Sequence, residues 1–350
     1  KFYRRVGRQL IDLGPADALL FLQKILQRIR FLTSHLGLCQ VHAYSAAYLM
    51  QNRFPSGIRK EYRENGRFGI SVLCEQADHY VFEKVTFIGT ERDTSEPIGV
   101  WVKREAERQR RGYSELREAH RAAYAEYFAP MDIQIENDAQ ADGYLRFASY
   151  HTAISAPRHD SIHGVAAKGL TGERYNQFVW WDCEIHQLPF FMLTAPQTAK
   201  NLLMYRWERL EQAKKNAAAA GYCGAKFAFC SSVTGEERVW EYVRHPFMQV
   251  HINSDIPLGI LNYYACTQDR EFLKEYGLKM IHECTRFWMS RVTFRRERYE
   301  ILQVTGTDEH HPYVDNDAYT NYCVAFVLKK FLLLSREFGY ALAEQEYNKI

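Results

Sequence analysis

The chain has 350 residues, of which 45 are Lys or Arg and 42 are Asp or Glu, so its net charge is +3. A charge this close to neutral disfavours nucleic-acid binding by the whole surface, and 47% hydrophobic residues disfavour intrinsic disorder. No stretch approaches the roughly 18 consecutive apolar residues of a membrane-spanning helix, and the first residues show no apolar core of a signal peptide.

The eight cysteines are scattered along the chain. No two of them form a CxxC pair, and none combines with His at zinc-finger spacing. Cysteines dispersed in this way are typical of buried free thiols in a reducing compartment. We therefore expect a cytoplasmic protein that has no membrane partner and holds no metal.

Residues 1–100 alternate short β-prone segments with turn-rich stretches. The clearest alternation of apolar and polar residues is at 80–88, and the segments 38–44 and 69–73 have similar composition. We predict part of a β-sandwich over this region. Residues 16–31 have the composition of a helix and do not fit that pattern.

Residues 101–135 are charged and helix-prone, and we predict that they form a helical linker. An Arg-rich run with interleaved Glu occupies 103–111. We favour a solvated helix face for this run, because mixed charges on a helix usually face water. An RNA-binding arm is the alternative.

From residue 136 onward the apolar spacing predicts one helix after another. The expected helices span 137–154, 182–193, 197–220, 249–266, 270–292 and 318–338, with a further start at 340. Pro196 suits a first helical turn, and Gly221 suits the position just after a helix. The long connections at 155–180, 221–246 and 293–317 are of the kind that build a functional site.

The connection at 304–316 contains two adjacent carboxylates, Asp308 and Glu309, followed by two His residues. The pKa values of adjacent carboxyl groups in a cleft can be pushed apart, so that one stays protonated and acts as a general acid. The alternative is a polar loop that caps the next helix through Asn316.

A second motif reads Trp180-Trp181-Asp182-Cys183-Glu184. The apolar face of a sugar ring packs on an aromatic ring, while carboxylates accept hydrogen bonds from neighbouring hydroxyls. This combination indicates a sugar site. The alternative is a pair of core tryptophans at the start of a helix.

A third segment, 234–246, is a polar loop with aromatic residues, including Trp240, and it precedes the helix that carries His251 and Asp255. It could line a site for an acceptor molecule, or it could be a solvated loop. The chain lacks GxxxxGK[ST], GxGxxG and HExxH signatures, which disfavours nucleotide cofactors and a catalytic metal.

Taken together and in this order, these segments resemble glycoside hydrolase family 65. The matching residues include Gly-Leu-Thr-Gly-Glu at 169–173, Trp-Asp-Cys-Glu-Ile at 181–185, His-Ile-Asn-Ser-Asp-Ile at 251–256, Thr-Gly-Thr-Asp-Glu-His at 305–310 and Asp-Asn-Asp-Ala-Tyr-Thr-Asn at 315–321. The match is strong over 165–335 and weaker over 70–165. Each motif alone is unspecific, whereas the ordered set is specific.

The resemblance implies a mainly α fold. A β-sandwich remnant at 1–100 and a helical linker at 101–135 would precede the N-terminal part of an (α/α)6 barrel at 136–350. The chain holds fewer helices than a complete barrel needs. We therefore expect an incomplete chain that is inactive and poorly soluble by itself, since an open barrel exposes apolar helix faces.

The family contains inverting phosphorylases of maltose, trehalose, kojibiose and nigerose, together with some trehalose hydrolases. Glu309 falls on the glutamate of the family's GxDE motif, which implies that it is the general acid. Inverting hydrolases use a second carboxylate to activate water, whereas in the phosphorylases inorganic phosphate attacks the anomeric carbon. The implied products are β-glucose 1-phosphate and a free acceptor sugar.

The tryptophan and aspartate at 181–182 match the family's pair at the transferred glucose. The predicted substrate-binding residues are Trp181, Asp182, Asp308, Glu184, Trp240 and His251. We expect the Glu309 carboxylate to lie within about 12 Å of the Trp181 ring, because one glucose must touch both.

Where the family often has Gly-His before its FWDTE motif, this chain has Gln-Phe at 177–178. With the departure at 239–248 from the maltose type, this favours a kojibiose- or nigerose-like specificity. The expected partners are a disaccharide and inorganic phosphate, without a cofactor, and a homodimer is left open. The alternatives are a trehalase-like inverting hydrolase and a non-catalytic carbohydrate-binding homologue.

Overall fold

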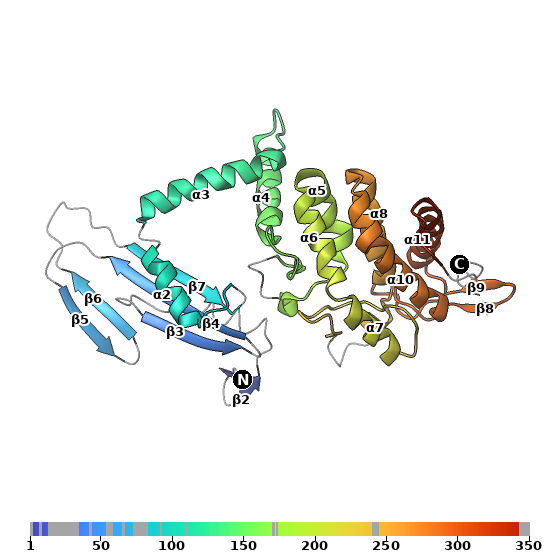
Figure 1. Cartoon of the computed structure of the whole chain (residues 1–350), viewed down its shortest axis with the longest axis horizontal. Helices are drawn as coiled ribbons and strands as arrows, with labels where there is room; N and C mark the ends of the chain where they lie inside the picture. The colour runs from blue at the N-terminus through green and yellow to red at the C-terminus, as the bar shows by residue number, and fades with distance from the viewer. Residues whose placement is uncertain are drawn as a thin grey trace. The chain divides into compact units, whose positions relative to one another are not determined.

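The computed structural model describes residues 3–6, 9–12, 35–41, 44–53, 59–64, 67–72, 83–91, 93–108, 111–169, 172, 174–239 and 245–342. The chain divides into two compact units, Lys1–Tyr127 and Phe128–Ile350. The first unit contains most of the strands, and the second is helical (Figure 1).

The strands of the N-terminal unit pair antiparallel. They are β1 (Tyr3–Val6) with β2 (Gln9–Asp12), β5 (Arg59–Glu64) with β6 (Arg67–Val72), and a three-stranded sheet of β3 (His35–Val41), β4 (Tyr44–Arg53) and β7 (Glu83–Thr90). The predicted strands near 38–44, 69–73 and 80–88 are confirmed as β3, β6 and β7. Their closure into a sandwich stays a prediction, and 16–31 lies outside the described residues.

Two helices follow, in the region predicted as a helical linker. In α2 (Ile98–Arg108) the buried residues Ile98, Val102 and Ala106 are spaced four apart, so they form one face, which packs against Phe87. In α3 (Tyr113–Phe128) no described side chain is buried. Helices therefore occupy most of this region, while its boundaries at 101 and 135 stay predictions.

The Arg-rich run at 103–111, for which a solvated helix face is favoured over an RNA-binding arm, overlaps the end of α2. Arg104 pairs with Glu96, and Arg108 lies 3.4 Å from Glu105. These are the intrahelical and short-range pairs of a helix face in water, which supports the solvated interpretation that we favoured.

The C-terminal unit is an array of helices. They are α4 (Ala139–Ser155), α5 (Leu188–Thr194), α6 (Pro196–Trp207), α7 (Leu210–Ala219), α8 (Ile252–Thr267), α9 (Arg270–Phe272), α10 (Leu278–Arg291) and α11 (Ala318–Glu337). Figure 1 shows α5, α6, α8, α10 and α11 side by side in chain order, and each contacts the next. Short 3-10 turns η1 (Ala129–Met131), η2 (Arg174–Gln177) and η4 (His245–Met248) lie between them.

The main core of this unit is built from one face of every helix in the row. Phe191 of α5, Leu202 of α6, Ile256 of α8, Ile281 of α10 and Phe331 of α11 are all buried in one cluster. Burial of such side chains from water is the main driving force that holds the array together. Among the described residues, no helix is long and apolar enough to cross a membrane.

The predicted helix at 182–193 begins as a π turn, η3 (Cys183–Gln187), before α5 continues it. The backbone N–H of Leu188 donates to the carbonyl of Cys183, five residues back. Pro189 follows and has no N–H to donate. In a regular α-helix a proline ring also clashes with the carbonyl four residues back. A wider turn just before the proline relieves part of that clash, and the apolar spacing alone does not reveal such a turn.

The predicted single helix at 197–220 is wrong, because the chain breaks it between α6 and α7. Arg209 leaves the helical conformation, with φ −107° and ψ 6°. Its guanidinium donates to the carbonyls of Tyr205, Ile162 and Val233. The break therefore lets one side chain tie two distant loops to the helix pair. Gly221, with φ +80°, follows α7 as predicted.

Two further boundaries differ from the predictions. Helix α8 begins at Ile252 rather than at 249, because a 3-10 turn (η4) occupies 245–248. The predicted helix at 270–292 contains a second π turn, η5 (Leu273–Gly277), between α9 and α10. The connection at 293–317 begins with a hairpin of β8 (Thr293–Arg295) and β9 (Arg298–Glu300), whose two turn residues both have positive φ.

Pro257 lies inside α8 and leaves the carbonyl of Asn253 without its usual helical donor. The indole Nε1 of Trp288 on α10 donates to that carbonyl over 3.3 Å. The Asn253 side chain in turn accepts from the backbone N–H of Phe227 over 2.7 Å. A neighbouring helix thus replaces the hydrogen bond that the proline removes.

A buried ion pair joins the π turn η3 to α6. Glu184 and Arg206 are 2% and 1% exposed, and the guanidinium donates to both carboxylate oxygens, over 2.7 and 2.9 Å. It also donates to the carbonyl of Trp180 over 3.2 Å. Burial raises the pKa of Glu184, while the charge and hydrogen bonds of Arg206 oppose that shift.

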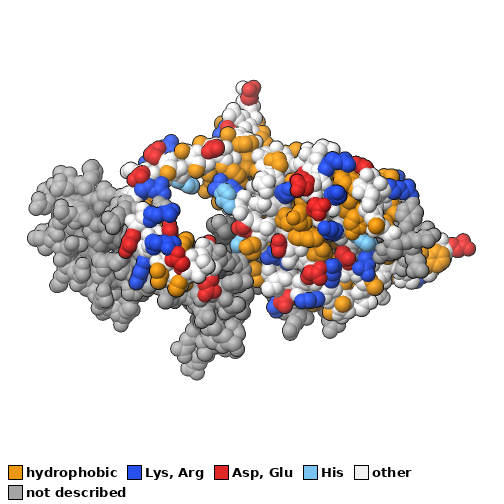
Figure 2. All heavy atoms as spheres, in the orientation of Figure 1, with side chains coloured by type: hydrophobic (Ala, Val, Ile, Leu, Met, Phe, Trp, Pro, Cys, Tyr) orange, Lys and Arg blue, Asp and Glu red, His pale blue; other side chains and the backbone are white. Residues whose placement is uncertain are grey.

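Apolar side chains also remain on the outside of the helical unit. Figure 2 shows hydrophobic patches among its charged side chains. Tyr144 and Phe147 of α4 are 67% and 66% exposed, and Tyr322 of α11 is 72% exposed. Large apolar areas on a surface usually mark a contact with another part or partner.

We predict that Gly224→Ala destabilises the protein far more than Gly221→Ala. Both glycines have positive φ, so both changes introduce backbone strain of about 1 kcal/mol. A Cβ at 224 would also collide with the backbone of Glu283 and Phe287 on α10, whereas a Cβ at 221 would meet nothing within 4 Å. Urea unfolding should show that Gly224→Ala lowers the free energy of unfolding by more than about 3 kcal/mol. Equal losses would contradict this packing.

We predict that Glu184→Gln lowers the free energy of unfolding by about 3–5 kcal/mol, because it leaves the buried Arg206 charge without its partner. The matched control is Glu211→Gln, which removes the exposed pair with Lys214 and should change stability little. Urea unfolding of both variants checks the prediction. A Glu184→Gln protein as stable as the control would be incompatible with an energetically important pair.

Candidate active site

Trp181 lies just before the π turn η3 and is half-buried, packed against two clusters of the core. Three rings lie edge-on or tilted against it, those of His186, His251 and Tyr319, at centroid distances of 5.1, 5.0 and 6.2 Å. The neighbouring Trp180 is only 8% exposed. One tryptophan of the pair therefore belongs to the core, and the other offers a supported aromatic face.

The two carboxylates of this motif have different surroundings. Asp182 is half-buried and does not cap the helix that begins beside it. Glu184 is buried, and Arg206 occupies both of its oxygens. This corrects the predicted direct contact of Glu184 with substrate, because the carboxylate has neither solvent access nor an unused charge. Asp182 stays the candidate for binding sugar hydroxyls.

His251 is fully buried at the start of α8. Its Nδ1 lies 2.7 Å from a carboxylate oxygen of Asp255, one turn further along the helix. The other oxygen of Asp255 accepts a hydrogen bond of 2.8 Å from the hydroxyl of Tyr319 on α11. Burial raises the pKa of Tyr319, so the phenol stays a donor. The predicted substrate-binding residue His251 is therefore buried and contacts the Trp181 ring.

The loop that carries the predicted acid is closed by a bridge between Val304 and Val314, which exchange both backbone hydrogen bonds, over 2.9 and 2.8 Å. Gly306 lies against the carboxylate of Asp317, where a Cβ would collide. Asp317 caps α11 by accepting from the backbone and hydroxyl of Thr320. The cap is therefore Asp317 and not Asn316, which we had considered.

Asp308 and Glu309 lie at the exposed end of this loop. The carboxylate of Asp308 lies 2.6 Å from the His311 ring and accepts from the backbone N–H of His310. The hydrogen bond from His311 lowers the pKa of Asp308 below its usual value. Asp308 is therefore an ionised carboxylate at neutral pH, which suits hydroxyl binding better than proton donation.

Gln249 connects the acid loop to the aromatic site. Its side-chain amide donates a long hydrogen bond of 3.4 Å to Glu309, and it lies 3.4 Å from the carbonyl of Gly306. The backbone of Thr305 donates to Met248, directly before Gln249. Since Gln249 lies two residues before His251, the Glu309 loop and the Trp181 ring are joined by continuous contacts. That Glu309 and Trp181 share one sugar site stays a prediction.

The third predicted segment is only partly described. Trp240 lies outside the described residues, so its role stays a prediction. Within the described part, Glu237 accepts hydrogen bonds of 2.9 Å from the backbone N–H groups of Phe229 and Cys230. This carboxylate organises the base of the loop rather than facing a ligand.

Three residues at the site were missed as candidates from the sequence: Gln249, Asp255 and Tyr319. The spacing of His251 and Asp255, four residues apart on one helix, was a usable signal, because such residues share a helix face. Gln249 and Tyr319 had no such signal. Their importance depends on contacts across the fold.

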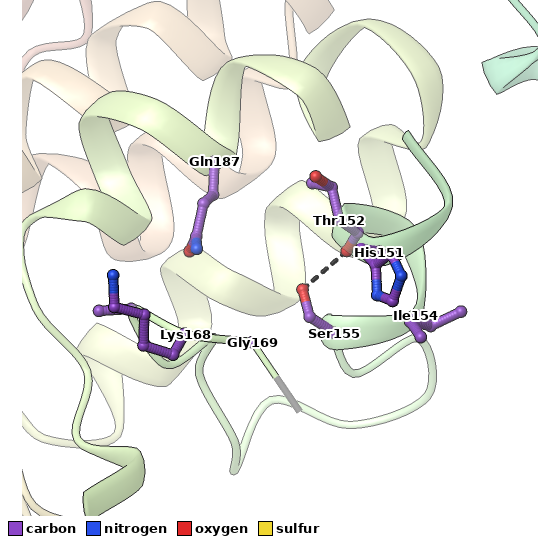
Figure 3. A pocket seen from close by; sticks show the side chains of 8 residues that line it. His151, Thr152, Ile154, Ser155, Lys168, Gly169 and Gln187 are labelled. Atoms are coloured by element: carbon purple, nitrogen blue, oxygen red, sulfur yellow. Dashed lines mark hydrogen bonds between the residues drawn. The ribbon is translucent and has the colours of Figure 1, made fainter. Parts of the chain in front are cut away.

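A separate pocket of about 300 Å³ lies in the same unit. Figure 3 shows His151, Thr152 and Ser155 of α4 on one side, and Lys168, Gly169 and Gln187 on the other. None of the predicted site residues lines it. Among the described residues, no group of three or more His, Cys, Asp or Glu side chains could hold a metal ion.

Comparisons with known proteins identify the family of the chain. The model of the glycosyl hydrolase family 65 central catalytic domain matches residues 146–349. A 3-O-α-D-glucosyl-L-rhamnose phosphorylase from Lachnoclostridium phytofermentans is 44% identical over 86% of this chain and 39% of its own length. A kojibiose phosphorylase from Thermoanaerobacter brockii is 42% identical over 61% of this chain and 29% of its own length.

The fold has a solved counterpart. A structure named for a kojibiose phosphorylase from the human microbiome superposes with a TM-score of 0.77 over 91% of this chain and 45% of its own length, at 19% identity. The chain thus spans less than half the length of these relatives. The family model covers more than half of the chain, including both the aromatic and the acid motifs. The chain belongs to glycosyl hydrolase family 65.

Proposed function

We propose that the intact protein is an inverting α-glucoside phosphorylase in which Glu309 is the general acid. The observation that carries this proposal is the continuity of contacts from Glu309 through Gln249 and the start of α8 to the Trp181 ring. The Glu309 carboxyl group is accessible to a bound sugar, and in its protonated form it would be able to donate a proton to the glycosidic oxygen. The relatives described above are named as phosphorylases, and this supports the same reaction class.

In this reaction Glu309 gives its proton to the glycosidic oxygen as the bond to the anomeric carbon breaks. An oxygen of inorganic phosphate forms the new bond from the opposite face, which inverts the configuration and gives β-glucose 1-phosphate and a free acceptor. Trp181 packs against the transferred glucose, while Asp182 and Asp308 accept hydrogen bonds from its hydroxyls. Phosphate takes the place of the water that a second carboxylate activates in inverting hydrolases, and the proposal needs no cofactor.

The acceptor is the less defined half of the substrate. We favour a disaccharide with an α-linked glucosyl unit of the kojibiose or nigerose type, with Trp240 near the acceptor. The activity assay should also include a substrate in which rhamnose is the acceptor, because one relative is named as a glucosyl-rhamnose phosphorylase. Inorganic phosphate and these disaccharides are the proposed partners, and a homodimer stays open.

We propose that the helical row from α4 to α11 is part of an (α/α)6 barrel. The neighbour-to-neighbour packing of successive helices supports this. The exposed aromatic residues on α4 and α11 are also the surfaces that further barrel helices would cover. The alternatives on the same fold are hydrolysis by water and carbohydrate binding without catalysis.

We predict that Glu309→Gln lowers phosphorolysis in the intact protein by at least about 100-fold, because an amide is far too weak an acid to protonate the leaving oxygen. The matched control is Glu297→Gln at the exposed turn of the β8–β9 hairpin, which should keep the parent's rate. The assay measures glucose 1-phosphate from kojibiose, nigerose and glucosyl-rhamnose, with and without inorganic phosphate.

The outcomes separate the proposed function from its alternatives. Glucose 1-phosphate that forms only with phosphate, and is lost in Glu309→Gln, supports an acid-catalysed phosphorylase. Release of free glucose at the same rate without phosphate would show a hydrolase instead. An unchanged rate in Glu309→Gln would show that Glu309 is not the acid.

A further inference from the structure

The carboxylate of Asp255 lies near the candidate site and is bonded on both of its oxygens. It is fully buried, with His251 at 2.7 Å from one oxygen and Tyr319 at 2.8 Å from the other. The two partners come from different parts of the chain, since His251 precedes Asp255 by one turn at the start of α8 and Tyr319 lies in the first turn of α11. One buried acid therefore links two helices.

The two side chains that Asp255 holds are both ring neighbours of Trp181. The His251 ring is nearly perpendicular to the Trp181 ring, at 86°, with centroids 5.0 Å apart. The Tyr319 ring is inclined at 62° to it, at 6.2 Å, and is perpendicular to His251 at 5.5 Å. The three rings thus contact one another. The position of two of them is fixed by hydrogen bonds to a single group.

The nearest charged groups are paired with each other. Arg206 of α6 donates to both oxygens of Glu184 in the π turn, and burial, together with the negative charge of Asp255, raises the pKa of Glu184. Cys323 of α11 also lies close enough to interact with Tyr319. Because the Asp255 carboxylate is shielded from bulk solvent, its hydrogen bonds are stronger than they would be at the surface. The rings are therefore held at a set angle.

We propose that Asp255 is a positioning residue for the sugar site, which acts through His251 and Tyr319 to set the plane of the Trp181 ring. The inference rests on the proposed function, in which that ring packs against the transferred glucose. Stacking of a sugar on an aromatic face depends on the orientation of the ring. The same segment also carries Gln249, which contacts Glu309, so the aromatic face and the acid share one support.

The test compares two tyrosines that make the same kind of bond. Tyr319→Phe removes the hydroxyl that donates to Asp255, while it keeps the ring. Tyr263→Phe removes a hydroxyl that donates to Asp269 over 3.1 Å. Tyr263 is also buried in this unit, on α8, but it is not among the ring neighbours of Trp181. A purely structural role predicts similar behaviour of the two variants.

In the intact protein we expect Tyr319→Phe to raise KM for the disaccharide and the dissociation constant of glucose by about tenfold, with kcat within about twofold of the parent's value. This split is expected because the ring contacts substrate and transition state alike. Asp255→Asn should raise KM at least as much. Tyr263→Phe should leave KM and glucose binding unchanged, even where thermal unfolding shows a loss of stability.

A folded Tyr319→Phe protein with KM and glucose affinity within twofold of the parent's values would overturn the proposal. Equal increases in Tyr319→Phe and Tyr263→Phe would also overturn it, since they would indicate general loosening. If the Asp255→Asn protein does not fold, the KM and glucose affinity of Tyr319→Phe alone test the proposal. Glucose binding by calorimetry does not require turnover, so this result can be read separately from a failure of the proposed phosphorylase reaction.

Discussion

The ion pair between Glu184 and Arg206 is the constraint on which the site depends. A bidentate pair without solvent access is stable only when both partners are present and well oriented. Here it fixes the π turn η3 against α6 and holds the carbonyl of Trp180. Trp181 and Asp182 lie directly between these two anchored points. Their position therefore follows from a buried electrostatic contact that no ligand needs to touch.

Two sets of buried contacts hold the candidate site, the ion pair of Glu184 with Arg206 and the hydrogen bonds of Asp255. The ion pair fixes the backbone of the aromatic motif, and the Asp255 network packs its ring. Gln249 extends the second set to the loop of Glu309. The residues that would touch a sugar are thus exposed or half-buried, while those that hold them are buried. Such a division suits a site whose geometry must exist before substrate arrives.

The helices were predictable from the sequence because their apolar residues recur at helical spacing, as in α10 and α11. The β-rich character of the first unit followed in the same way from alternation. The π turns, the break at Arg209 and the β8–β9 hairpin were not predictable, since they depend on Pro189, on distant carbonyl groups and on turn geometry. The acidic motif was found correctly as a loop. Glu184 was predicted to bind substrate because the sequence does not reveal its partner. In the structure its carboxylate pairs with the buried Arg206.

The hydrogen bond from Trp288 to Asn253 has a consequence for folding. Because Pro257 removes the local donor, α8 alone cannot satisfy its own backbone near its first turns, and α10 must dock to do so. Helix formation in α8 and its packing against α10 are therefore parts of one cooperative step. Since His251 and Asp255 lie in that same stretch of α8, the docking of α10 also supports the buried groups of the candidate site.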